Sequence, residues 1–160
     1  MAPKSAYDSE LDEVRAALRP MMQRFGPDYW RRIDAERAFP TEFFDVMGEA
    51  GYFGTFIPEE YGGVAAGARV ASVLVEEVNR GGGDAAALNA QMSICRTLVL
   101  NGNEEQKKRY LPAVAAGDIR FLTVAATEPD SGANMKELSS TARREGDEWV
   151  LNASKVMISF

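Results

Sequence analysis

Hydrophobic side chains recur every three or four residues through the first two thirds of the chain, and charged residues lie between them. The clearest run forms one apolar stripe, made of Leu11, Val14, Leu18, Met21 and Phe25. This period is typical of an amphipathic α-helix that turns one face toward a core. Comparable patterns predict further helices over residues 41–51, 66–80 and 84–101.

Capping residues predict where these helices begin and end. Thr41 is expected to be an N-cap, and Gly51 is expected to stop the same helix. Asp84 is expected to cap the helix that follows it. The Asn-x-x-Gln arrangement at Asn103 is close to a capping box and predicts one more helix. Pro112 is expected to kink or break that last helix.

The pattern then changes to short apolar runs between turn residues. Residues 119–126 suit a strand, and residues 138–152 suit two strands about the tight turn "EGDE". The segment "KVMISF", which starts at Lys155, is expected to begin another strand. The second part of the chain is therefore predicted to be β-structure.

This change of period divides the chain into two predicted domains. Residues 1–118 are expected to form a helical domain, and residues 119–160 the incomplete beginning of a β domain. The predicted fold class is α+β. At 160 residues the chain can bury one core and a small second lobe.

Composition narrows the kinds of function. Hydrophobic residues make up 46% of the chain and charged residues 26%, as in ordinary globular proteins, and the net charge of −6 makes nucleic acid or an anionic membrane a poor partner. No run approaches the ~20 apolar residues of a membrane span, and the first residues lack the apolar region of a secretory signal. With one cysteine, Cys95, we expect a cytoplasmic protein without a disulfide or a metal site.

Histidine is absent from the sequence. This excludes His-based catalytic triads, His metal sites and the usual general base near neutral pH. The phosphate-binding P-loop and the G-x-G-x-x-G pattern are also missing. Any chemistry must therefore use carboxylates, hydroxyls, backbone amides or a bound cofactor.

Four segments occur in the order and at the spacing found in acyl-CoA dehydrogenases: "FIPEEYGG", "GNEEQKKRYLPAVAAGD", "ATEPDSGAN" and "GDEWVLNASKVMIS". The chain resembles that family over essentially its whole length. The resemblance implies an FAD-dependent enzyme with a helical N-terminal domain, a β-barrel-like middle domain and a C-terminal helical bundle. This sequence matches the first domain and the first strands of the second, without the bundle, so we expect a longer polypeptide or a partner to complete the fold.

The resemblance also implies site residues. Those expected to bind the FAD cofactor are Val124, Ala126, Thr127, Gly132, Ala133, Met157, Ile158 and Ser159. Gly132 and Ala133 would lie near the diphosphate and the CoA thioester arm. The residues expected to line the substrate site are Asn89, Met92 and Ala133.

The chemistry of "ATEPDSGAN" suits a flavin. Small side chains such as Ala126 leave room for a flat ring, Thr127 offers polar groups at its rim, and Gly132 lets the backbone approach a diphosphate. The same residues would also make an ordinary strand-ending turn. The chain departs from the family pattern at Ala133, where a serine is usual, at Met157, where a tryptophan is usual, and at Ala153, where a glycine is usual.

The reaction implied by the resemblance is the α,β-dehydrogenation of an acyl-CoA thioester, with hydride transfer to the flavin. A carboxylate must remove the α-proton. In the family this base is a glutamate of the C-terminal domain, so no catalytic residue is expected within this sequence, and Glu128 is not expected to be the base. The 160-residue chain alone is expected to be inactive.

The partners implied are an acyl-CoA substrate, an electron-transfer flavoprotein or similar acceptor, and further copies of the chain in a homotetramer. The residues fix neither the acyl chain nor the electron acceptor, so a flavin oxidase of the same superfamily stays open. A second alternative is a non-catalytic helical scaffold that binds a protein or an acyl group. Failure to bind flavin would favour that alternative.

Overall fold

The computed structural model describes residues 6–121 and 123–158. These residues fall into two compact units, divided after Leu122. We call residues 6–121 the helical unit and residues 123–158 the hairpin unit, and we describe each by itself. The α+β fold class is confirmed, whereas the domain boundary after residue 118 stays a prediction.

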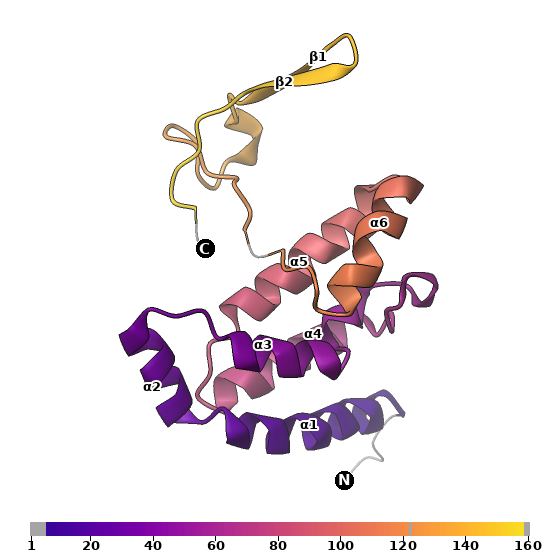
Figure 1. The fold of residues 1–160 in the computed structure, drawn as a ribbon, viewed down its shortest axis with the longest axis vertical. Helices are drawn as coiled ribbons and strands as arrows, with labels where there is room; N and C mark the ends of the chain where they lie inside the picture. Colours follow the sequence, from indigo (N-terminus) through magenta and orange to yellow (C-terminus); the bar gives the residue numbers. More distant parts are fainter. Residues whose placement is uncertain (1–5, 122, 159–160) are drawn as a thin grey trace. The chain divides into compact units, whose positions relative to one another are not determined.

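The helical unit contains six α-helices and two short 3-10 helices among its described residues (Figure 1). They are α1 (Ala6–Arg24), α2 (Pro27–Glu36), α3 (Thr41–Glu49), η1 (Tyr52–Phe56), η2 (Glu59–Tyr61), α4 (Gly67–Arg80), α5 (Ala86–Asn101) and α6 (Glu104–Ala115). Every helix predicted from the apolar period is present. Helix α2 was not predicted; it has Pro27 in its first turn and no fully buried residue, so its apolar signal is weak.

The helix ends follow local chemistry, with three corrections. The predicted cap Asp84 is wrong by one position: Ala85 is the N-cap of α5, and the Asp84 carboxylate accepts from the Ala86 N–H at 2.8 Å. Gly51 follows the C-cap of α3 with φ of +77°, and the capping box at Asn103 is complete, as predicted. Thr41 is the first helical residue, and Pro40 is the N-cap, so the predicted N-cap is wrong by one position. The predicted break at Pro112 is also wrong: α6 continues to Ala115, with the proline ring exposed to solvent in its last turns.

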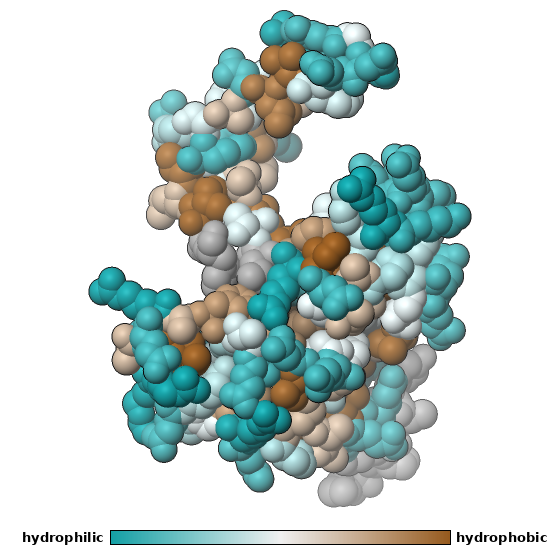
Figure 2. Space-filling view, in the orientation of Figure 1, coloured by the Kyte–Doolittle hydropathy of each residue, from teal (hydrophilic) through white to brown (hydrophobic). Residues whose placement is uncertain are grey.

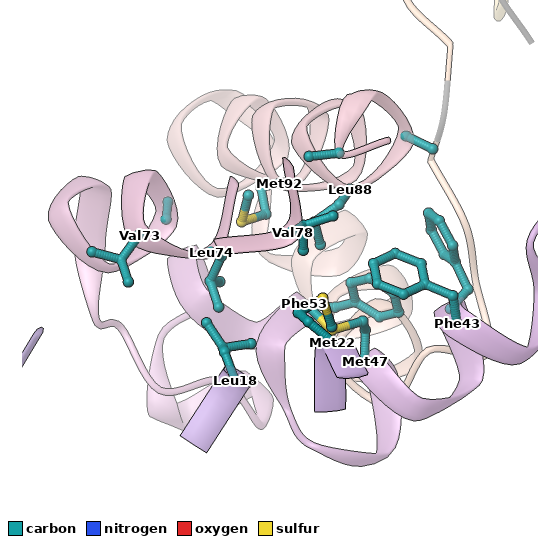
Figure 3. Packing of buried hydrophobic residues seen from close by; sticks show 14 of the residues in the cluster. Leu18, Met22, Phe43, Met47, Phe53, Val73, Leu74, Val78, Leu88 and Met92 are labelled. Atoms are coloured by element: carbon teal, nitrogen blue, oxygen red, sulfur yellow. The ribbon is translucent and has the colours of Figure 1, made fainter. Parts of the chain in front are cut away.

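The main core lies between α1, α3, η1, α4 and α5. Figure 3 shows side chains from these elements pointing toward one another, among them Leu18, Met22, Phe43, Met47, Phe53, Leu74, Val78 and Leu88. The predicted stripe of α1 is confirmed at Leu18 and Phe25, which are 0% and 1% exposed, whereas Met22 is buried more fully than its neighbour Met21. Buried aromatic rings meet edge to face, for example Phe25 and Phe43 at 5.5 Å between centroids.

A smaller core cluster joins η2, α5 and α6 through Tyr61, Cys95 and Leu111. The segment after α6 is held on α5 by Gln91, which is 0% exposed. Its amide group donates to the Ile119 carbonyl at 3.0 Å and accepts from the Phe121 N–H. The backbone there bonds to a side chain rather than to a neighbouring strand. The strand predicted over 119–126 is therefore absent from the described residues of that range.

The hairpin unit is built on one antiparallel hairpin, β1 (Thr141–Glu145) and β2 (Glu148–Asn152), preceded by the short 3-10 helix η3 (Met135–Glu137) (Figure 1). Thr141 pairs with Asn152, and Glu145 with Glu148. The tight turn predicted at "EGDE" is confirmed, with Gly146 at φ of +63°. Every residue of both strands is exposed, and Figure 2 shows hydrophobic surface on this hairpin.

The strand predicted from Lys155 is absent over residues 155–158, while Ser159 and Phe160 lie outside the described residues. A β-strand requires a neighbouring strand that pairs with its backbone N–H and C=O groups along its length. Among the described residues, this segment makes one backbone bond to a distant residue, from the Val156 N–H to the Thr127 carbonyl at 3.0 Å. Within the described ranges, no helix is long and apolar enough to cross a membrane.

Candidate flavin-binding site

Two segments that the sequence analysis assigned to the flavin lie side by side in the hairpin unit. The Val156 N–H donates to the Thr127 carbonyl at 3.0 Å, and the Lys155 ammonium donates to the Ala126 carbonyl at 3.1 Å. These bonds join segments 29 residues apart. They bring Ala126 and Thr127 next to the chain that carries Met157 and Ile158.

We call the paired residues 126–127 and 155–156, with the nearby predicted flavin contacts Val124, Met157 and Ile158, the seam. The exposed fractions of Val124, Met157 and Ile158 are 63%, 88% and 37%, while Ala126 and Thr127 are half-buried. Exposed apolar side chains are suited to contact with a flat, mostly apolar ring. The residue types present therefore fit a flavin ring. Ser159, the last predicted contact, lies outside the described residues.

Met157 has an unusual backbone conformation. Its φ is +55°, in the left-handed region that a long side chain rarely adopts. Such a residue carries a local cost of ~1–3 kcal/mol and persists where neighbouring bonds fix it. The two bonds made by Lys155 and Val156 immediately precede it.

A tight turn follows the first segment. Glu128 and Ser131 exchange backbone hydrogen bonds at 2.9 and 3.2 Å, and the Ser131 hydroxyl donates to the Asn134 carbonyl at 2.8 Å. The next two residues, Gly132 and Ala133, are exposed. A Cβ added at Gly132 would meet no atom of the described residues within 4 Å. The fold of this unit therefore does not itself require glycine there, and the backbone stays open to a ligand.

Glu128 is 4% exposed and forms the centre of a polar network. Its carboxylate accepts from the Lys155 ammonium at 2.8 Å, the Ser139 hydroxyl at 2.7 Å, and the backbone N–H groups of Ser139 and Ser140 at 2.6 and 3.1 Å. The Lys155 bond, followed by those from Ser140 and Ser139, holds the pKa of Glu128 well below its ordinary value. A carboxylate so engaged suits a structural role and is a weak base.

The sequence analysis did not single out Lys155, Ser139 or Ser140. The available signal was Glu128 itself, because an acidic residue at the end of an apolar run must be paired with donors if it is buried. The lysine lies 27 residues further along the chain, and nothing in the spacing identifies it as the partner.

Two of the three predicted substrate-lining residues, Asn89 and Met92, lie in the helical unit, whereas Ala133 lies in the hairpin unit. Asn89 is exposed on α5 and borders a groove between α4 and α5, whose other residues include Phe56, Ser72 and Arg96. The Arg96 guanidinium lies 5.1 Å from the centre of the Phe56 ring. Met92 is 1% exposed and packs in the main core.

Comparison with known proteins gives a consistent result. The family model "Acyl-CoA dehydrogenase, N-terminal domain" matches residues 8–118. The glutaryl-CoA dehydrogenase of Desulfococcus multivorans is 40% identical over 156 residues, which cover 92% of this chain and 38% of that protein. A solved glutaryl-CoA dehydrogenase in complex with glutaryl-CoA has a TM-score of 0.81 and 33% identity, over 99% of this chain and 40% of that one.

A second solved structure is similar to the same degree. The prolyl acyl carrier protein oxidase AnaB has a TM-score of 0.81 and 29% identity, over 96% of this chain and 41% of that one. The present chain thus spans between 38% and 41% of the length of these three relatives.

Proposed function

Because the chain belongs to the acyl-CoA dehydrogenase family, we propose that it supplies part of the flavin and substrate site of an FAD-dependent acyl-CoA dehydrogenase. The observation that carries the proposal is the pairing of residues 126–127 with residues 155–156. The exposed apolar residues Val124, Met157 and Ile158 lie within two residues of these paired positions along the chain. The matching family and the residue chemistry of the seam point to the same ligand.

The residues of the hairpin unit bind and orient the cofactor in this proposal. Val124, Ala126, Met157 and Ile158 cover the ring, and Thr127 offers a hydroxyl and a backbone N–H to its polar rim. Gly132 and Ala133 leave the backbone open to the diphosphate. When bound, FAD supplies the hydride acceptor for α,β-dehydrogenation. The base that removes the α-proton is proposed to lie outside this sequence, as the family resemblance implies. Glu128 is not proposed as the base, because its carboxylate is engaged by Lys155, Ser139 and Ser140.

The proposed substrate is an acyl-CoA thioester. Asn89, Met92 and Ala133 remain the proposed substrate-lining residues. The proposed electron acceptor is an electron-transfer flavoprotein or a similar protein, and the proposed assembly is a homotetramer in the cytoplasm. The relatives are longer than this chain, which covers 38% and 40% of two of them. Each of these proposals therefore concerns the whole protein and not this chain alone.

The first test is size-exclusion chromatography of the native protein with full-spectrum absorbance detection. We expect a yellow peak at the mass of an oligomer, and bleaching of its visible absorbance when an acyl-CoA is added without oxygen. A colourless peak that stays colourless after addition of FAD would contradict the proposal. That outcome would favour the non-catalytic scaffold, in line with the unusual residues at Ala133, Ala153 and Met157.

The similarity to an acyl carrier protein oxidase favours a second candidate, a flavin oxidase of the same superfamily. The two candidates differ in how the reduced protein reacts with oxygen. An oxidase regains its visible absorbance in air at the rate of turnover and forms hydrogen peroxide. A dehydrogenase stays bleached under the same conditions until an electron acceptor is added.

A further inference from the structure

We propose that Lys155 and Glu128 are positioning residues that hold the two flavin-facing segments of the hairpin unit in register. This inference rests on the proposed function, because it concerns the same flavin site. It assigns a role to two residues that, in this proposal, do not contact the cofactor. We call the pair and its bonds the Lys155–Glu128 clasp.

The geometry of the clasp joins consecutive residues of both segments. The Lys155 ammonium donates to the Ala126 carbonyl at 3.1 Å and to the Glu128 carboxylate at 2.8 Å. Between these two anchor points, the Thr127 carbonyl accepts from the Val156 N–H at 3.0 Å. Three successive residues of one segment are thus fixed by two successive residues of the other.

The side chains of the Lys155–Glu128 clasp are largely shielded from solvent. The side chains of Glu128 and Lys155 are 3% and 23% exposed. Charge-assisted hydrogen bonds are short and directional, and a buried carboxylate without its cation is strongly unfavourable. The Glu128 carboxylate also accepts from Ser139 and Ser140, just before β1, so the clasp also ties the seam to the hairpin.

The position of the clasp explains the conformation of Met157. This residue follows Lys155 and Val156 directly and has φ of +55°. A methionine adopts that conformation where neighbouring bonds determine the path of the chain. Loss of the Lys155 bonds is expected to release Met157 from its place on the seam.

The test compares variants of the native protein, with the flavin removed and restored. Lys155→Met removes the ammonium at similar length, and Lys155→Arg keeps the charge. Glu128→Gln removes the opposite partner, and the double variant completes a cycle. Lys136→Met is the matched control, because Lys136 is exposed in the same unit and loses the same charge. The readouts are amide hydrogen exchange of residues 123–131 and 153–158, the FAD dissociation constant, and the visible circular dichroism of bound FAD.

We expect Lys155→Met to speed exchange in both segments, with and without FAD, and to weaken FAD binding by about tenfold, the size of one charge-assisted bond. Its visible circular dichroism should change, Lys155→Arg should restore it in part, and Lys136→Met should match the wild type. The effects of Lys155→Met and Glu128→Gln should not add, because each breaks the same pair. Non-additivity and faster exchange distinguish this from a general loss of folding, which would affect exchange in the helical unit as well.

Unchanged exchange in Lys155→Met would overturn the clasp. Faster exchange with unchanged FAD affinity and unchanged circular dichroism would overturn its role in positioning the flavin. If the wild type binds no FAD, the proposed function fails, and the clasp as a flavin-positioning device fails with it. Exchange in the flavin-free protein would still show in that case whether the clasp holds the two segments together.

Discussion

A buried carboxylate such as Glu128 must be stabilised by donors, and the hairpin unit supplies them from Lys155, Ser139 and Ser140. These bonds lower the folded-state pKa of Glu128, with the Lys155 bond as the largest cause. A lowered pKa means that the carboxylate stabilises the folded unit above its unfolded pKa of ~4.3. That stabilisation is lost as the pH falls from this value toward the folded-state pKa.

We therefore expect a carbon-detected NMR titration to show Glu128 still ionised at about pH 3, where a free glutamate is mostly protonated. In the Lys155→Met variant the midpoint of Glu128 should move upward, and the acid limb of the unfolding curve should start at higher pH. Titration of Glu128 at the ordinary value in the wild type would mean that the network does not form in solution.

Substitution of Gly132 tests whether glycine is required at this position for ligand binding rather than for folding. A Cβ at this position meets no atom of the described residues within 4 Å, so Gly132→Ala should change the stability of the protein by no more than about 0.5 kcal/mol. The same methyl group would lie where the backbone is proposed to approach the diphosphate, so FAD binding should weaken. Equal FAD affinity in Gly132→Ala and the wild type, measured by quenching of flavin fluorescence, would remove Gly132 from the proposed site.

The turn between β1 and β2 depends on Gly146, whose φ is +63°. A first central residue with positive φ is what a two-residue hairpin turn requires, and alanine disfavours it by roughly 1 kcal/mol. Since every strand residue of the hairpin is exposed, this loss should open much of it. We expect Gly146→Ala to weaken the cross-strand NMR contact between Arg143 and Val150. Asp147→Ala, whose backbone φ is not positive, should preserve it.

The helices were predictable because each carries its own apolar period and its own capping residues, as the complete capping box at Asn103 illustrates. Helix α2 escaped prediction because no residue in it is fully buried. The strands expected over 119–126 and from Lys155 were wrong for the described residues, because a strand depends on a neighbour that local sequence does not specify. Gln91 binds the backbone of the first segment instead.

The assignment of the flavin site stays a prediction. Motif resemblance named the segments around Thr127 and Met157, and the structure shows that these two segments are hydrogen-bonded to each other. It did not name Lys155, whose role depends on a contact across 27 residues with Glu128. A contact of this kind depends on the three-dimensional path of the chain, so no local sequence pattern predicts it.

The two units differ in how they are stabilised. Both core clusters formed by described residues lie entirely within the helical unit, with Leu18 and Leu88 in the larger and Leu111 in the smaller. In the hairpin unit the buried residues are Glu128 and Ser131, which are polar. Burial of apolar area is the main stabilising contribution to a fold. The helical unit therefore has apolar cores of its own, whereas the hairpin unit relies on hydrogen bonds and ion pairs, of which Lys155–Glu128 has a buried carboxylate.

The end of the helical unit can be tested by shortening the chain. A chain of residues 1–122 retains Ile119 and Phe121, the hydrogen-bond partners of the fully buried Gln91, and should unfold cooperatively in urea. A chain of residues 1–117 leaves the Gln91 side-chain amide without these partners, and its free energy of unfolding should be lower by about 1–3 kcal/mol. Equal stability of the two chains would show that Gln91 finds other partners or water. A non-cooperative transition in residues 1–122 would mean that the helical unit depends on polypeptide beyond its own core.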